Sequence, residues 1–127
     1  AKEDLQIWIV EHAYLLKEIR KRELKRAIKL EFGERVSRWF DDRKITENGK
    51  LSGQLSKLLE ELSEMEDGLL NRDMEEVKDG IGDAAAVHAG IAHMRRMTFE
   101  ECCEHAWNEI KDRKGYLNEQ GIFVKEE

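Results

Sequence analysis

The sequence predicts an all-α protein, a helical bundle of about four to five helices. Three observations lead to this prediction. None of the 127 residues is proline, the residue that interrupts helices and marks loops. Leucine, glutamate, lysine and alanine, which favour helices, are abundant. Apolar residues also recur three and four positions apart, the spacing that places them on one face of a helix.

The composition excludes several classes of protein. Charged residues make up 39% and hydrophobic residues 40%, which fits neither a disordered tail nor a membrane protein. The net charge of −6 argues against a general nucleic-acid binder. Cys102 and Cys103 are adjacent, and neighbours on a helix point about 100° apart, so we expect reduced thiols and a reducing compartment.

The first predicted helix covers residues 2–30. We expect it to form an N-terminal extension over residues 1–32, followed by the main domain over residues 33–127. We expect Gly33 to end this helix. Its apolar stripe consists of Leu5, Trp8, His12, Leu15, Leu16, Ile19, Leu24, Ala27 and Ile28. The helix also carries a basic cluster, Arg20, Lys21, Arg22, Lys25 and Arg26. We interpret this cluster as a solvated helix face, and the alternative is a contact surface for nucleic acid or a partner protein.

The second domain begins with two short predicted elements. A helix over residues 34–43 turns Val36, Trp39 and Phe40 inward. Residues 46–50 are expected to form a loop, because they contain an Asn-Gly turn signal. A long helix over residues 53–71, capped by Ser52, then carries an apolar stripe: Leu55, Leu58, Leu59, Leu62, Met65 and Leu69.

Two capping patterns mark the remaining helices. Asp73, with a glutamate three residues on, opens a helix that we expect to reach residue 97. Thr98, also with a glutamate three residues on, opens a further helix that reaches residue 114 and ends at Gly115. The segment over residues 121–125 is predicted to form an extended arm.

Acidic side chains on the long helix provide the first functional signal. Glu60, Glu61 and Glu64 are neighbours, because residues three and four apart lie on one helical face. Glu61 flanks the stripe that contains Leu58 and Leu62. We therefore expect its carboxylate at the edge of the core, facing a cleft, with a solvated acidic face as the alternative.

The next helix places more carboxylates in an apolar setting. Residues 80–92 are apolar or small almost all round, which predicts burial on more than one side. Asp83 lies within this run and Asp79 lies one turn earlier. A buried ionised carboxylate is costly unless it is paired or binds a cation. We therefore predict a divalent cation that joins this pair to Glu61 and Glu64, and oxygen ligands favour Mg²⁺ or Mn²⁺ over zinc. The alternative partners for Asp83 are Lys57, Lys111 and Arg113.

The last helix carries hydrogen-bond donors that suit a phosphate group. Asn108 and Lys111 share a face, and Arg113 and Lys114 follow at the end of the helix. A metal neutralises phosphate oxygens from one side while lysine or arginine binds them from the other, so this combination indicates a phosphorylated ligand. A favourable interaction of these cations with the helix C-terminus is the alternative.

Three segments resemble the MazG-like nucleotide pyrophosphohydrolases. Residues 54–64, QLSKLLEELSE, resemble the first motif of the family, EExxE. Residues 78–83, KDGIGD, resemble its second acidic motif. Residues 108–115 and 121–126 are similar to the end of phage-type members. These blocks occur in the order and spacing of the family, from about residue 36 to residue 126.

The resemblance implies an active site between two antiparallel helices, completed by dimerisation in a homodimer or homotetramer. It also implies Mg²⁺-dependent cleavage of a (d)NTP to the (d)NMP and pyrophosphate. The implied role is house-cleaning of the nucleotide pool, in the cytoplasm or in the host cytoplasm if a phage encodes the protein. Glu61, Glu64 and Asp83 fall on metal-ligand positions of the family. The commoner second motif is ExxD, but a glycine lies three residues before Asp83, so the fourth ligand is either Asp79 or Glu76.

The residues and the resemblance together suggest a mechanism. The predicted catalytic residues are Glu60, Glu61 and Glu64, and a carboxylate such as that of Glu60 orients a water that attacks the α-phosphorus. Either Lys111 or Arg113 is expected to stabilise the leaving pyrophosphate. The predicted substrate-binding residues are Lys57, Trp39, Asn108, Lys111 and Arg113, with Phe40 and Trp107 as further candidates to stack on the base.

Two other classes of protein are alternatives to this hypothesis. A catalytically inactive helical module that binds nucleotide or protein would use the basic cluster as its contact surface. A di-iron carboxylate bundle requires Glu-x-x-His pairs, and none of the four histidines follows an acidic residue at that spacing. The histidine and cysteine spacings also match no zinc site.

Overall fold

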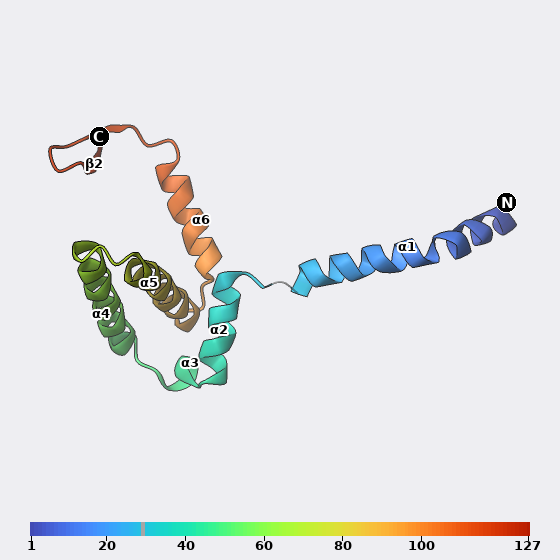
Figure 1. Ribbon diagram of the computed structural model, residues 1–127, viewed down its shortest axis with the longest axis horizontal. Helices are drawn as coiled ribbons and strands as arrows, with labels where there is room; N and C mark the ends of the chain where they lie inside the picture. The colour runs from blue at the N-terminus through green and yellow to red at the C-terminus, as the bar shows by residue number, and fades with distance from the viewer. Residues whose placement is uncertain (29) are drawn as a thin grey trace. The chain divides into compact units, whose positions relative to one another are not determined.

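The computed structural model describes residues 1–28 and 30–127, with the side chains of all of these except residues 24–28. The chain divides into two compact units, Ala1–Glu31 and Phe32–Glu127. The described residues form six helices and one two-stranded sheet (Figure 1), which confirms the predicted all-α fold. Every helix among these residues is too short or too polar to cross a membrane.

The first unit consists of one long helix, α1 (Lys2–Ile28), as the sequence predicts. The expected end of this helix includes Lys29, which lies outside the described residues, as do five predicted side chains: Leu24, Lys25, Arg26, Ala27 and Ile28. Over the described part, the apolar stripe is largely exposed to solvent, with Leu15 at 55%. The rings of Trp8 and His12 stack with centroids 4.3 Å apart, and His12 Nδ1 lies 2.7 Å from the Trp8 carbonyl oxygen.

Helix α2 (Phe32–Asp42) includes Gly33, so the prediction that this glycine ends the first helix is wrong. A contact with a distant segment explains the difference. The N–H of Gly33 donates to Glu100 Oε1 at 2.8 Å, and a Cβ at this position would lie 2.7 Å from Phe99 Cβ. The glycine therefore allows α2 to approach the start of a later helix closely.

The inward face of α2 is confirmed at Phe40, which is 5% exposed, and at the half-buried Val36. The prediction that Trp39 also points inward is wrong, because its side chain is 48% exposed. The predicted loop over residues 46–50 is wrong in its first part, because a single helical turn, α3 (Ile45–Asn48), forms there.

Asp41 joins α2, α3 and a later helix. Its Oδ1 accepts a hydrogen bond from Thr46 Oγ1 at 2.6 Å and lies 2.8 Å from His93 Nε2. The hydrogen bond from Thr46, followed by that from His93, lowers the pKa of Asp41 below its ordinary value. This junction holds the short elements against the rest of the unit.

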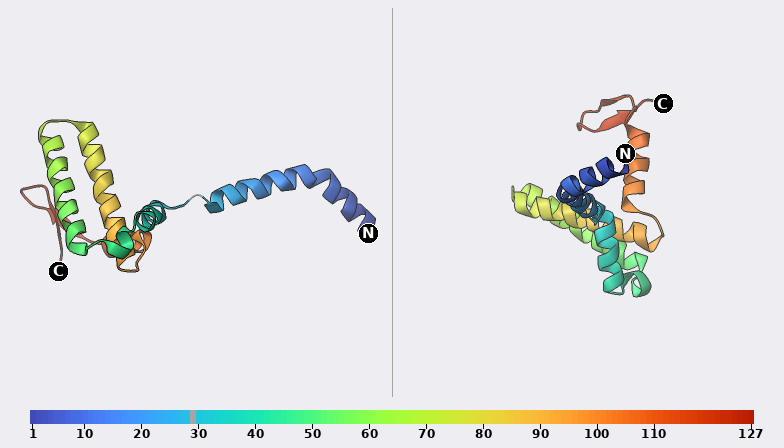
Figure 2. Two further views of the ribbon diagram at one scale, coloured as in Figure 1. Left: turned by 90° about the horizontal axis from the view of Figure 1, so that it is seen from below. Right: turned by 90° about the vertical axis from the view of Figure 1, so that its right-hand side faces the viewer.

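Two antiparallel helices, α4 (Leu51–Leu70) and α5 (Met74–Met94), form the centre of the second unit and lie side by side in Figures 1 and 2. Glycines permit this close packing. A Cβ at Gly80 would lie 2.9 Å from Met65 Cβ, and one at Gly68 would lie 3.1 Å from Val77 Cγ2. The two helices that carry the predicted acidic residues are therefore in direct contact.

The helix ends are only partly as predicted. Asp73 caps α5 by accepting from the N–H of Glu76 at 3.2 Å, as expected. The predicted cap Ser52 is wrong, because α4 begins at Leu51 with Lys50 at its N-cap. Ser52 lies in the first turn, where its carbonyl accepts from Ser56 Oγ at 3.1 Å. Helix α5 also ends three residues before the predicted end at residue 97.

Helix α6 (Phe99–Ile110) begins with the predicted capping box. The N–H of Glu101 donates to Thr98 Oγ1 at 3.1 Å, and the N–H of Thr98 donates to Glu101 Oε1 at 2.6 Å. The helix ends at Ile110 rather than at residue 114. The predicted arm is extended, and it pairs as β2 (Phe123–Lys125) with the antiparallel strand β1 (Gly115–Leu117), a pairing that the sequence did not suggest.

The buried core is small and lies where α2 meets α5. The ring of Phe40 packs directly against Gly90, and four further apolar residues of α5 are also buried: Ala84, Val87, Ala89 and Ala92. The predicted stripe on α4 is mostly exposed, since only Leu58 and Met65 are half-buried and the others are open to solvent: Leu55, Leu59, Leu62 and Leu69.

Substitution of Gly90 by alanine is expected to destabilise the fold. The new Cβ would overlap three ring atoms of the buried Phe40, and overpacking of this kind costs about 1–3 kcal/mol. Gly82→Ala, on the same helix, meets nothing within 4 Å and should be neutral or stabilising by up to about 1 kcal/mol. Urea denaturation of both variants measures the difference, and equal midpoints would contradict this packing.

Candidate functional site

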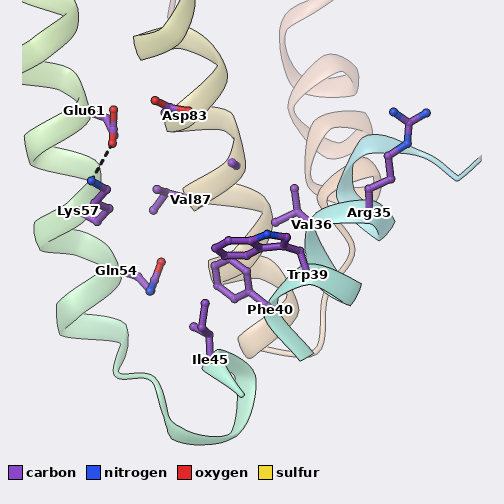
Figure 3. Close-up of a pocket in the computed structure, with 11 residues that line it drawn as sticks. Arg35, Val36, Trp39, Phe40, Ile45, Gln54, Lys57, Glu61, Asp83 and Val87 are labelled. Atoms are coloured by element: carbon purple, nitrogen blue, oxygen red, sulfur yellow. Dashed lines mark ion pairs between the residues drawn. The ribbon is translucent and has the colours of Figure 1, made fainter. Parts of the chain in front are cut away.

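A pocket of about 610 Å³ opens between the α4–α5 hairpin and the short helices α2 and α3 (Figure 3). Its wall has an apolar part, formed by Val36, Trp39, Phe40, Ile45, Ala86 and Val87. The other part is polar or charged, formed by Arg35, Gln54, Lys57, Glu61 and Asp83. The pocket therefore combines an aromatic surface with a cluster of ionisable groups.

Glu61 is the most unusual residue of this pocket. It is only 3% exposed although it is an acid. Its Oε1 lies 3.1 Å from Lys57 Nζ, one turn earlier on α4, whereas the buried Oε2 has no hydrogen-bond partner. A buried carboxylate oxygen without a partner costs free energy, so this atom marks a place where a donor or a cation would be stabilising.

Asp83 faces Glu61 from the neighbouring helix. Figure 3 shows the two carboxyl groups at the same level of the hairpin. Desolvation raises the pKa of Asp83, and the charges of Glu61 and Asp79 raise it further. The prediction that Asp83 is buried is wrong, because its side chain lies at the open pocket and is exposed. Asp79 is exposed as well and lies one turn before Asp83 on α5. Asp83 is therefore electrostatically coupled both to Glu61 on α4 and to Asp79 on its own helix.

Glu64 completes this set of interacting acids. Its side chain is exposed, and the charge of Glu61 is the main cause that raises its pKa, followed by desolvation and the charge of Glu60. Glu61 thus interacts with one acid on its own helix and one on the facing helix. In the part of the chain that the structure describes, no three side chains of His, Cys, Asp or Glu are close enough together to hold a metal ion in their present positions.

Lys57 is paired with the acids of its own helix. Its Nζ lies 3.1 Å from Glu61 Oε1 and 3.6 Å from Glu60 Oε2. The hydrogen bond with Glu61 is the main cause that raises the pKa of Lys57, with the charge of Glu60 next. Lys57 is one of the three alternative partners predicted for Asp83, but it forms its ion pairs with Glu60 and Glu61 instead.

The predicted substrate-binding residues fall into two groups. Trp39 lines the pocket, and the Arg43 guanidinium lies 4.2 Å from the centroid of its ring. Three residues near the end of α6 are not among the residues that line the pocket in the described part of the chain: Asn108, Lys111 and Arg113. Asn108 instead donates to Glu104 at 3.4 Å on the exposed face of α6, and Trp107 is also outside the pocket.

Two polar residues of the pocket were missed as candidates for its function. Arg35 lies four residues before Trp39, and Gln54 lies three before Lys57, so each pair shares a helical face. That spacing was present in the sequence and would have placed both residues in the pocket.

Comparison with known proteins does not assign the chain to a family. No family model matches the sequence, and no curated protein or solved structure was found to match it.

The raised pKa of Asp83 predicts a stability cost at neutral pH. An acid with a raised pKa stabilises the folded state while it is protonated, and this contribution is lost as the pH rises from below 3.8 through the raised value. In EDTA at pH 7, Asp83→Asn should therefore raise the urea midpoint above that of the unaltered protein, and the difference should shrink near pH 3. Asp112→Asn, outside the hairpin, serves as the control, and an unchanged midpoint in Asp83→Asn would refute the coupling.

Proposed function

We propose that the protein is a Mg²⁺-dependent nucleoside triphosphate pyrophosphohydrolase, which cleaves a (d)NTP to the (d)NMP and pyrophosphate. The motifs in the sequence support this proposal, and one structural observation carries it. The Oε2 atom of Glu61 is buried without a partner, in a pocket that Asp83 also lines. A bound cation would compensate for the lost hydration of this carboxylate.

The acids of the hairpin suit a hard divalent ion. Glu61, Glu64, Asp79 and Asp83 offer only oxygen atoms, the ligands that Mg²⁺ and Mn²⁺ prefer. Glu64 and Asp79 are exposed, so rotation about their side-chain bonds can bring both carboxylates toward the central pair without backbone movement. Glu76 lies in the first turn of α5, so we favour Asp79 as the fourth ligand. Bound here, Mg²⁺ would polarise the α-phosphoryl group and offset the triphosphate charge.

The two parts of the wall fit the two parts of a nucleotide. Lys57 and the carboxylates provide a charged end for the triphosphate. The exposed indole face of Trp39, with the apolar side chains around it, provides a surface for the base. The volume of about 610 Å³ lies within the range of small-molecule sites.

The residues of this chain would share the chemical work as follows. Lys57, whose pKa is raised, stays protonated and binds phosphate oxygens. Glu60 is exposed beside it, and its carboxylate can orient a water toward the α-phosphorus and take up the proton of that water. The O–P bond to pyrophosphate breaks as the new O–P bond forms. Lys111 and Arg113 lie outside the pocket, so in this proposal they would reach the pyrophosphate from a second copy of the chain.

A homodimer or homotetramer is part of this proposal. The exposed leucines of α4 form an uncovered apolar surface next to the site, and burial of such a surface between copies would be favourable: Leu55, Leu59, Leu62 and Leu69.

Loss of either central acid is expected to abolish catalysis. Glu61→Gln and Asp83→Asn each remove one negative charge and keep the shape of the side chain, so Mg²⁺-dependent pyrophosphate release should fall by at least about 100-fold. A panel of canonical and modified dNTPs with a coupled pyrophosphate assay measures this. Asp112→Asn is the matched control and should keep full activity. Normal turnover by Glu61→Gln would disprove the proposed site.

The same assay separates the second functional class that the sequence allows. A chain that binds dNTPs in the presence of Mg²⁺ but releases no pyrophosphate would be a catalytically inactive nucleotide-binding module. Isothermal titration with a non-hydrolysable dNTP analogue measures binding independently of turnover.

Trp39→Ala should weaken substrate binding more than turnover. Stacking on an aromatic ring contributes about 0.5–1.5 kcal/mol, which corresponds to a rise in KM of about 2- to 12-fold with kcat nearly unchanged. Trp107→Ala removes an indole outside the pocket and is the matched control. Equal KM values for the two variants would argue against base binding at Trp39.

A further inference from the structure

The wall of the pocket includes the carboxamide of Gln54, whose hydrogen-bonding groups the fold does not use. The backbone N–H of Gln54 donates to the Lys50 carbonyl oxygen at 3.1 Å, as in a regular helix. Gln54 is half-buried, and its side-chain amide has no hydrogen-bond partner among the residues that the structure describes. Because a polar group that is partly desolvated gains by finding a partner, this amide suits a ligand that enters the pocket.

The amide lies at the aromatic end of the pocket. Figure 3 shows Gln54 pointing from α4 toward Phe40 and Ile45, whereas Lys57 lies further along the helix. Glu61 follows Gln54 by seven residues, which is two turns and about 10 Å along α4. The neutral amide and the buried acid therefore occupy the two ends of the part of the wall that α4 contributes.

This separation matches the two parts of a nucleotide. With the phosphates held at the acids and Lys57, the sugar carries the base away from them and toward Trp39. The pairing edge of a base is uncharged and carries hydrogen-bond donors and acceptors side by side. A carboxamide offers both an acceptor and donors, so it can bind such an edge, whereas a charged side chain costs more to desolvate against it.

We infer that Gln54 is a specificity-determining residue, whose side-chain amide binds the pairing edge of a base stacked on Trp39. This inference rests on the proposed function and names the part of the substrate that the site selects. Rotation of the amide by 180° exchanges its donor and acceptor, so the same residue can bind an oxo or an amino group. Nucleotides with a free pairing edge are therefore substrates, and a modification that blocks this edge excludes them. A modification on the opposite edge leaves the contact intact.

A double-mutant cycle between the protein and the base tests this contact. The canonical dNTP that the unaltered chain cleaves fastest is compared with the analogue that lacks the exocyclic group of its pairing edge: 2-pyrimidinone for cytosine, 5-methyl-2-pyrimidinone for thymine, purine for adenine and 2-aminopurine for guanine. Loss of this group should lower kcat/KM of the unaltered chain about fivefold, the effect of one neutral hydrogen bond. In Gln54→Leu the same loss should be less than about twofold, because the partner on the protein is already absent.

Gln120→Leu is the matched control for this cycle. Gln120 is exposed in the turn before β2 and is not among the described residues that line the pocket, so this variant should respond to the analogue as the unaltered chain does. If the chain binds dNTPs without cleaving them, dissociation constants from isothermal titration of the same pairs complete the cycle.

The outcomes separate this inference from the proposed function. An undiminished response to the analogue in Gln54→Leu, or none in the unaltered chain, overturns the role of Gln54 while Mg²⁺-dependent pyrophosphate release stands. Absence of both turnover and binding for every dNTP overturns the proposed function and this inference with it.

Discussion

The buried carboxylate of Glu61 is the constraint on which the second unit depends. Its side chain is held between α4 and α5, where Lys57 satisfies one oxygen and the other has no partner. The charge of this group also raises the pKa values of Glu64 and Asp83. A hairpin that selection favoured for stability alone would not keep like charges together at its centre. A bound cation would relieve this repulsion, and this is the reason for the magnesium site that we propose.

Close packing elsewhere offsets this electrostatic cost. The glycines at positions 68 and 80 bring α4 and α5 into contact away from Glu61, and Phe40 seats on Gly90 at the other end of α5. Asp41 adds hydrogen bonds that join α2, α3 and α5. Because these contacts flank the acids on both sides, the backbone is fixed while the carboxylates remain under repulsion. The backbone of the site is thus in place, whereas the exposed side chains of Glu64 and Asp79 would still have to turn toward the central pair to bind an ion.

The apolar residues of this chain lie mostly on its surface. Phe40 and a few small residues of α5 form the core, whereas leucines of α4 and the stripe of α1 are exposed. These two surfaces belong to different units of the chain. With so small a core, the chain would gain further stability if such surfaces were buried in the homo-oligomer that we propose.

The sequence by itself determined the helical fold, because periodic apolar residues and the absence of proline act locally. It also determined the capping box at Thr98, whose partners are three residues apart, and the acids of α4 and α5, whose spacing fixes their faces. Only the tertiary structure decided which residues meet across elements. Gly33 lies inside a helix because it meets Glu100, and the tail forms a hairpin because β2 pairs with β1 across the loop of residues 118–122. It also showed that Lys57, rather than Lys111 or Arg113, accompanies the acids, since a charge pattern along one helix carries no information about which other helix it faces.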